Sequence, residues 1–268
     1  MGLPQLKPHP NLDQLREALS PRFASRVQSA RELLRPPEQL VRQAPLATGW
    51  PELDRLLAGG LERGALTELV GEPSSGRFTL VLGVVARTTA LGEAAALVDL
   101  GGHLEPESVR QAGGAPDRLL WLLPQHLRQA QAAAEKLLAC GIPLVVLDLG
   151  SPPVAGGRGM EGAWVRLARA ARARRAVFLL ASPYRASGTA AAVVLKARRE
   201  RVRWQGAGAA RLLGGVDVSL WVEKSRLQAP SAQPQREQLS LWVDGSLQQV
   251  EGSLKQVEGS LERLAEAR

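Results

Sequence analysis

The chain has 268 residues, 45% of them hydrophobic, so it can bury one large core and has a globular rather than a disordered composition. Its single cysteine, Cys140, excludes a disulfide framework and a cysteine-based zinc site, and with three histidines we expect no metal site. The net charge of +8 is compatible with nucleic-acid binding, and also with the arginine-rich composition of a GC-rich genome. The apolar runs are too short to cross a bilayer and we find no secretory signal, so we expect a cytoplasmic protein without membrane contact.

Residues 1–45 are predicted to form an N-terminal arm of two short helices. Asn11 is a suitable N-cap for the first helix, Pro21 opens the second, and Pro36 and Pro37 end it. An arm of this kind packs either on its own core or on a neighbouring molecule, and both arrangements fit the sequence.

Residues 46–230 are predicted to form the core, because short apolar runs alternate there with helical patterns. The expected strands and helices, in chain order, are strand 65–70, helix 76–90, strand 94–100, helix 106–112, strand 119–123, helix 125–139, strand 142–149, helix 162–175, strand 176–181, and further strands near 190–194 and 216–223. This rhythm predicts an α/β fold with a mostly parallel, twisted sheet and helices on both faces.

Residues 231–268 are predicted to be a linker and a tail that contains a seven-residue repeat. The repeat reads VDGSLQQ, VEGSLKQ and VEGSLER over residues 243–263. Its Leu and Val spacing fits a heptad helix that needs a partner surface, although three glycines weaken that helix. One alternative is a hairpin turn at Asp244 and Gly245 after the strand-like segment 239–243, and another is replication slippage without function.

Residues 71–78 read GEPSSGRF between a predicted strand and a predicted helix, which is the context of a phosphate-binding loop. Such a loop usually ends in Gly-Lys-Ser/Thr, whereas here Arg77 stands at the lysine position and Phe78 at the hydroxyl position that ligates Mg²⁺. Thr79 is rotated by about 100° around the helix and is a poor substitute. The degenerate nucleotide-binding residues are predicted to be Gly71, Ser74, Ser75, Gly76, Arg77, Phe78, Thr79 and Asp148.

The stretch 46–80, LATGWPELDRLLAGGLERGALTELVGEPSSGRFTL, resembles the RecA recombinase family, and the resemblance continues through 97–106 and 143–148. It covers about residues 46–230 and implies a RecA-like P-loop core. Asp148 ends an apolar strand at the position of the family's Walker B aspartate. Gly101 stands at the position of the catalytic glutamate, and Ser108 at that of the aromatic residue that stacks on adenine.

Four functional positions of the family therefore differ together, namely Arg77, Phe78, Gly101 and Ser108. The resemblance then implies a chain that is not an enzyme: ATP binding is allowed, but we expect no hydrolysis and no resident cofactor. Lys224 and Arg226 match a basic pair that reaches the ATP of the adjacent subunit in the family, so we expect them at an interface in trans; solvated charges at a strand edge are the alternative.

Two loops carry single-stranded DNA in the RecA family, and they correspond here to residues 152–160 and the much shorter 183–189. Arginines also recur at spacings of three in the helix 162–175 and cluster after residue 197. Solvated surface is the alternative role for both arginine groups. The DNA-binding candidates are Arg158, Tyr184, Arg185, Arg166, Arg169, Arg172, Arg198 and Arg199.

The degenerate loop, the short helical arm and the polar C-terminal extension together resemble the ImuA/SulA-like family. That resemblance implies a non-catalytic accessory of DNA-damage-induced (SOS) error-prone translesion synthesis. It implies RecA or a RecA filament, ImuB and a DnaE-type polymerase as partners, with weak binding of single-stranded DNA. The alternatives are a divergent DNA-stimulated RecA/RadA-type ATPase that uses Arg77 and Thr79, and a SulA-like inhibitor of cell division that binds FtsZ.

Overall fold

The computed structural model describes residues 44–150, 160–208, 211–227 and 236–242. Most of the predicted N-terminal arm, the seven-residue repeat and Arg158 lie outside these ranges. Within them, no helix combines the length and the apolar character that a membrane span requires.

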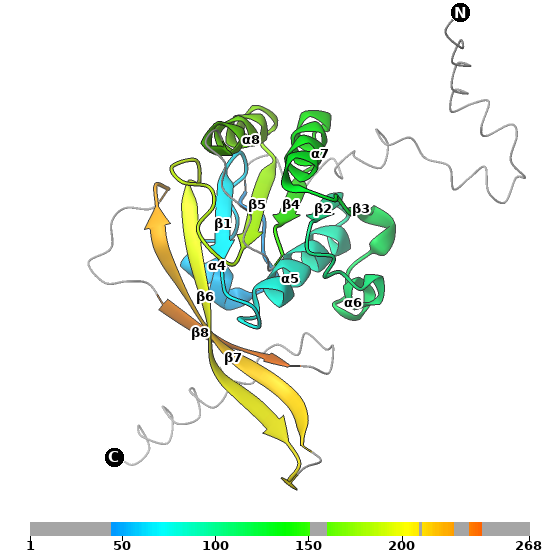
Figure 1. The fold of residues 1–268 in the computed structure, drawn as a ribbon, viewed down its shortest axis with the longest axis vertical. Coiled ribbons are helices and arrows are strands. Elements are labelled where there is room, and N and C mark those ends of the chain that lie inside the picture. The colour runs from blue at the N-terminus through cyan, green and yellow to red at the C-terminus, as the bar shows by residue number, and fades with distance from the viewer. Residues whose placement is uncertain (1–43, 151–159, 209–210, 228–235, 243–268) are drawn as a thin grey trace, which may run out of the picture.

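The described elements alternate strands and helices as far as β5 and then continue as strands (Figure 1). In chain order they are α4 Pro51–Leu56, β1 Leu66–Val70, α5 Arg77–Ala90, β2 Ala95–Asp99, α6 Pro106–Gln111, the 3₁₀ turn η1 Pro116–Arg118, β3 Leu119–Leu122, α7 Leu127–Cys140, β4 Leu144–Asp148, α8 Met160–Arg174, β5 Val177–Ser182, β6 Val193–Gln205, β7 Leu212–Ser225 and β8 Arg236–Trp242. Each predicted strand and helix up to residue 181 has a counterpart here.

The described strands form one eight-stranded sheet in the order β3-β2-β4-β5-β1-β6-β7-β8. The pairs from β3 to β6 are parallel, whereas β7 and β8 are antiparallel to their neighbours. The predicted α/β fold with a mostly parallel sheet is therefore confirmed. Because β1 and β4 are parallel strands of one sheet, the residues that follow them meet at the same carboxyl edge.

Helices cover both faces of the sheet, and the alternation of side chains along each strand supplies the two cores. In β4, Leu144 and Val146 pack in the core that includes α4, α5 and α6. Val145 and Leu147, on the opposite face of the same strand, pack with α7 and α8. Figure 1 shows these two groups of helices on opposite sides of the sheet. The strand reads as a continuous apolar run because both of its faces are buried.

The antiparallel part of the sheet differs from what the sequence predicts. The β6–β7 hairpin is longer than the short strands expected there, and its far end projects beyond the helices (Figure 1). Strand β8 lies in the stretch expected to be linker and tail, yet it pairs with β7, and its Leu239 and Leu241 are buried. The sheet therefore continues past residue 230, because alternating leucines there complete the core beside α4 and α5.

Candidate functional site

The loop 71–76 connects the carboxyl end of β1 to the start of α5 and has a strained, glycine-dependent backbone. Ser74 and Gly76 both have positive φ, 61° and 82°. A Cβ atom at Gly76 would lie 2.4 Å from the Leu241 side chain and 3.0 Å from that of Val218. The loop is thus packed against β7 and β8, and only glycine fits at its last position.

Arg77 is the first residue of α5, and its side chain turns into the protein, where it is 5% exposed. Its guanidinium donates one hydrogen bond to the Gly71 carbonyl and another, of 2.9 Å, to the Gly150 carbonyl. It also lies 3.5 Å from Oδ1 of Asp148. Burial lowers the pKa of Arg77, and the charge of Asp148 opposes that shift. A fixed cation therefore lies between the loop and the end of β4.

Asp148, at the end of β4, is fully buried and lies next to two further polar side chains. Its Oδ2 is 2.8 Å from Nδ1 of His103, whose side chain is one-third exposed. Asp99, at the end of β2, accepts hydrogen bonds from the backbone N–H groups of His103 and Leu104. Asp99, His103 and Asp148 offer ligand atoms within 4.8 Å of one another.

The remaining motif positions lie around this cluster. The Phe78 ring meets the His103 ring edge to face, with centroids 5.5 Å apart, and Thr79 is exposed. Gly101 has no room for a side chain, because a Cβ there would be 2.6 Å from both Gly150 Cα and the His103 ring. His103 is therefore the side chain that this loop presents to Asp148.

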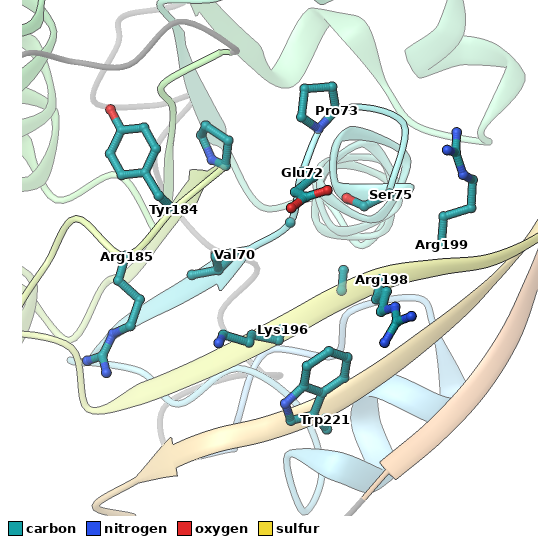
Figure 2. A pocket seen from close by; sticks show the side chains of 13 residues that line it. Val70, Glu72, Pro73, Ser75, Tyr184, Arg185, Lys196, Arg198, Arg199 and Trp221 are labelled. Carbon is teal, nitrogen blue, oxygen red and sulfur yellow. The ribbon is translucent and has the colours of Figure 1, made fainter.

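A pocket of about 450 Å³ opens beside the loop, and its walls come from four parts of the chain. We call it the basic pocket. Figure 2 shows Tyr184 and Arg185 on the turn after β5, Lys196 and Arg198 on β6, and Trp221 on β7. Further lining residues are Gly71, Glu72, Pro73, Ser75 and Arg199. The fold brings four of the DNA-binding candidates together around this pocket, namely Tyr184, Arg185, Arg198 and Arg199.

The turn that carries Tyr184 and Arg185 is held by Glu68, a fully buried residue of β1. The Glu68 carboxylate accepts hydrogen bonds from the Ala186 and Ser187 N–H groups and from the Ser187 hydroxyl. Glu68, His103 and Lys196 were not among the residues predicted from sequence. A carboxylate inside the apolar run of β1 is a signal that could have indicated Glu68.

The other predicted residues lie away from the basic pocket. Arg166, Arg169 and Arg172 are exposed on α8, and the last two line a separate pocket of about 650 Å³ near the start of β1. Arg226 donates hydrogen bonds to the carbonyls of residues 189, 190 and 191, so it stabilises the segment before β6 of its own chain. Lys224 is half-buried, and burial together with the charges of Arg226 and Arg185 lowers its pKa.

Comparison with known proteins finds RecA-like proteins both by sequence and by fold. Residues 38–162, which include the loop, β4 and Asp148, match the model of the RecA N-terminal domain. Protein RecA of Cutibacterium acnes is 36% identical over 113 residues, which are 41% of this chain and 32% of that protein. Protein RecA of Clavibacter michiganensis subsp. michiganensis is 40% identical over 111 residues, which are 40% of this chain and 31% of that protein. The chain spans about a third of the length of these relatives.

The crystal structure of the RadB recombinase superposes with a TM-score of 0.54 at 20% identity, covering 70% of this chain and 93% of that one. The chain has a RecA-like fold.

The expectation that the chain is not an enzyme conflicts with these relatives, since RecA proteins and the RadB recombinase are ATPases. That expectation is wrong. The altered motif lies inside the matched region, and the RecA-like site keeps a cation and a buried carboxylate at the loop despite its substitutions.

Proposed function

We propose that this RecA-like protein acts in DNA-damage tolerance and binds single-stranded DNA at the basic pocket. The observation that carries the proposal is that Arg185, Lys196, Arg198 and Arg199 line one pocket beside the loop, together with the aromatic residues Tyr184 and Trp221. Cationic side chains release counterions from phosphates, and aromatic rings offer surfaces on which bases stack.

The charges of the basic pocket differ in how far they are neutralised. Lys196 and Arg185 lie 3.0 Å and 3.7 Å from the carboxylate of Glu223. Arg198 and Arg199 are exposed on β6, and neither side chain has a hydrogen-bond or ion-pair partner among the described residues. Uncompensated charge on a solvent-facing strand is available to a polyanion, so these two arginines are expected to contribute most to binding.

Fluorescence anisotropy with a labelled single-stranded oligonucleotide tests this assignment. The double variant Arg198→Ala, Arg199→Ala should weaken binding about tenfold or more, since each phosphate contact contributes to affinity. The matched control is Arg166→Ala, Arg169→Ala, which removes two exposed arginines from α8 and should change affinity by less than about twofold if α8 is solvated surface. Equal losses in both double variants would reject the basic pocket as the DNA site.

The cellular role in this proposal is accessory action in error-prone translesion synthesis beside a RecA filament, ImuB and a DnaE-type polymerase. It is supported by the resemblance to the ImuA/SulA-like family and by a RecA-like fold that could dock on a RecA subunit. Co-sedimentation with RecA filaments on single-stranded DNA tests the first partner, and capture by ImuB tests the second. Deletion of residues 243–268 should weaken partner capture; unchanged capture would remove this tail from the role.

Nucleotide hydrolysis is a second candidate activity, favoured by the pair of Asp148 and His103. A buried carboxylate that orients an imidazole, whose other edge is partly exposed, is an arrangement that can take a proton from a water molecule. It would supply the base that Gly101 cannot.

ATP turnover by the full chain, with and without single-stranded DNA, tests the second candidate. Turnover lost in both Asp148→Ala and His103→Gln but kept in Asp117→Ala, an exposed carboxylate on η1, supports it. Turnover that survives His103→Gln rejects His103 as the base, and no turnover by the unaltered chain rejects the activity while DNA binding stands.

A further inference from the structure

The basic pocket contains a carboxylate, which the binding of phosphates does not use. Glu72 is an exposed residue of the loop after β1, and it is the acidic side chain among the described residues that line this pocket. Figure 2 shows it on the loop side of the pocket, with Lys196 on β6 and Trp221 on β7 across from it. Within the described part of the chain its carboxylate has no hydrogen-bond or ion-pair partner. Both oxygens are therefore available to accept hydrogen bonds from a ligand.

The cations of the basic pocket do not need Glu72 as their counter-charge. Lys196 and Arg185 already lie 3.0 Å and 3.7 Å from the carboxylate of Glu223. A further carboxylate at the pocket repels the phosphates that these cations attract, because the two groups carry like charge. Glu72 thus suits a part of the ligand that donates hydrogen bonds rather than one that carries negative charge.

The backbone holds Glu72 beside the turn that carries Tyr184. The Gly71 N–H group donates to the Ser182 carbonyl at 3.0 Å, and the Ser75 N–H group donates to the Glu72 carbonyl at 3.1 Å. The Tyr184 N–H group in turn donates to the Ser182 hydroxyl at 3.1 Å. An aromatic ring for the face of a base and a carboxylate for its edge therefore come from two segments that are bonded to each other.

Unpaired bases differ in what their edges offer to a carboxylate. Cytosine and adenine each present an exocyclic amino group, and guanine presents an amino group beside a ring N–H, all of which are donors. Thymine and uracil present a single ring N–H between two carbonyl oxygens, and these oxygens repel a carboxylate. Hydrogen bonds to an ionised acceptor are stronger than those between neutral groups, so this contact can discriminate between bases.

We propose that Glu72 determines base specificity at the basic pocket, where its carboxylate accepts a hydrogen bond from a base amino group and disfavours thymine. This inference rests on the proposed binding of single-stranded DNA at the same pocket. Contacts from the arginines to phosphates hold the strand without reading its sequence, and Glu72 supplies a contact that reads it.

Fluorescence anisotropy of the full chain with labelled oligo(dC) and oligo(dT) of equal length, at slightly alkaline pH, tests the proposal. The unaltered chain should bind oligo(dC) more tightly by about fivefold or more. In Glu72→Gln the amide also offers donors to the thymine carbonyls, so the ratio of the two dissociation constants should fall to about one. Because the two ligands carry equal charge, a general gain in affinity from removing a negative charge cancels in this ratio. Glu62→Gln, at an exposed glutamate before the amino end of β1, is the matched control and should keep the ratio.

Oligo(dU) separates recognition of the amino group from exclusion of the thymine methyl group, and it should bind as weakly as oligo(dT). The proposal is overturned if oligo(dU) binds as tightly as oligo(dC), if the unaltered chain binds all three equally, or if Glu72→Gln keeps the ratio. In each of these cases the binding of single-stranded DNA itself still stands. Failure of the proposed function is distinguishable, because the chain would then bind none of the three oligonucleotides, and that result overturns both.

Discussion

The loop side and the β6 side of the site both carry arginine, and they differ in what surrounds the charge. Arg77 is buried, bonded to two backbone carbonyls and placed beside a buried carboxylate. Arg198 and Arg199 lie in the exposed part of β6, and their side chains have no partner among the described residues. A buried charge with a partner affects the stability of the folded state. An exposed charge is screened by solvent, so it affects mainly the binding of a charged ligand. Substitutions on the two sides should therefore have separable effects on stability and on binding.

The largest expected effect is on the buried side. Asp148→Ala should lower the free energy of unfolding by about 3 to 5 kcal/mol, because it leaves the Arg77 guanidinium buried without its counter-charge. Urea unfolding followed by circular dichroism measures this loss. The control Asp117→Ala, at an exposed carboxylate, should change the free energy by less than about 0.5 kcal/mol. Similar small losses in both variants would mean that Arg77 is not paired as described.

The next effect concerns Glu68, which links the buried side to the turn that carries Arg185. Glu68→Gln should cost about 1 to 3 kcal/mol, because the amide turns donors toward the N–H groups of Ala186 and Ser187. The loosened turn should also be cleaved faster by trypsin after Arg185, which mass spectrometry can follow. Unchanged cleavage with reduced stability would show that Glu68 supports the sheet but not the turn.

On the exposed side, the effect should be on salt dependence rather than on stability. For single strands the slope of log affinity against log salt falls by about 0.7 per phosphate contact, so Arg198→Ala, Arg199→Ala should reduce it by about 1.4. Its unfolding free energy should stay within about 0.5 kcal/mol of the unaltered chain. An unchanged slope would mean that neither arginine contacts a phosphate.

The smallest effect is expected at the β6–β7 hairpin. Burial alone would raise the pKa of Asp217, but hydrogen bonds from Arg203 and Ser240 lower it below its ordinary 3.8. Because the folded pKa lies below the unfolded one, this contribution to stability is present above pH 3.8 and is lost as the pH falls through the folded value. In Asp217→Asn, the free energy of unfolding should fall less steeply as the pH is lowered below 3.8. The same pH dependence in both proteins would contradict a lowered pKa of Asp217.

Much of the fold could be predicted because β1, β2, β4 and β5 are buried on both faces. A continuous apolar run such as 144–147 indicates such a strand without reference to any partner. Strand β8 was predicted only in part, as the strand-like 239–243 of the hairpin alternative, because it alternates buried leucines with polar residues inside a Gln-rich stretch. Only its pairing with β7 distinguishes it from a linker.

By itself, the sequence determined that a loop follows β1, that it carries arginine and phenylalanine at its last two positions, and that an aspartate ends β4. Each of these follows from local order along the chain. Only the tertiary structure decided where the side chains lie, since Arg77 meets Gly150 and Asp148 across more than seventy residues. The same is true of His103 beside Asp148 and of the basic pocket, whose walls come from β1 and the loop after it, the turn after β5, β6 and β7. Such contacts depend on the order of strands in the sheet, and that order is fixed by packing between distant segments.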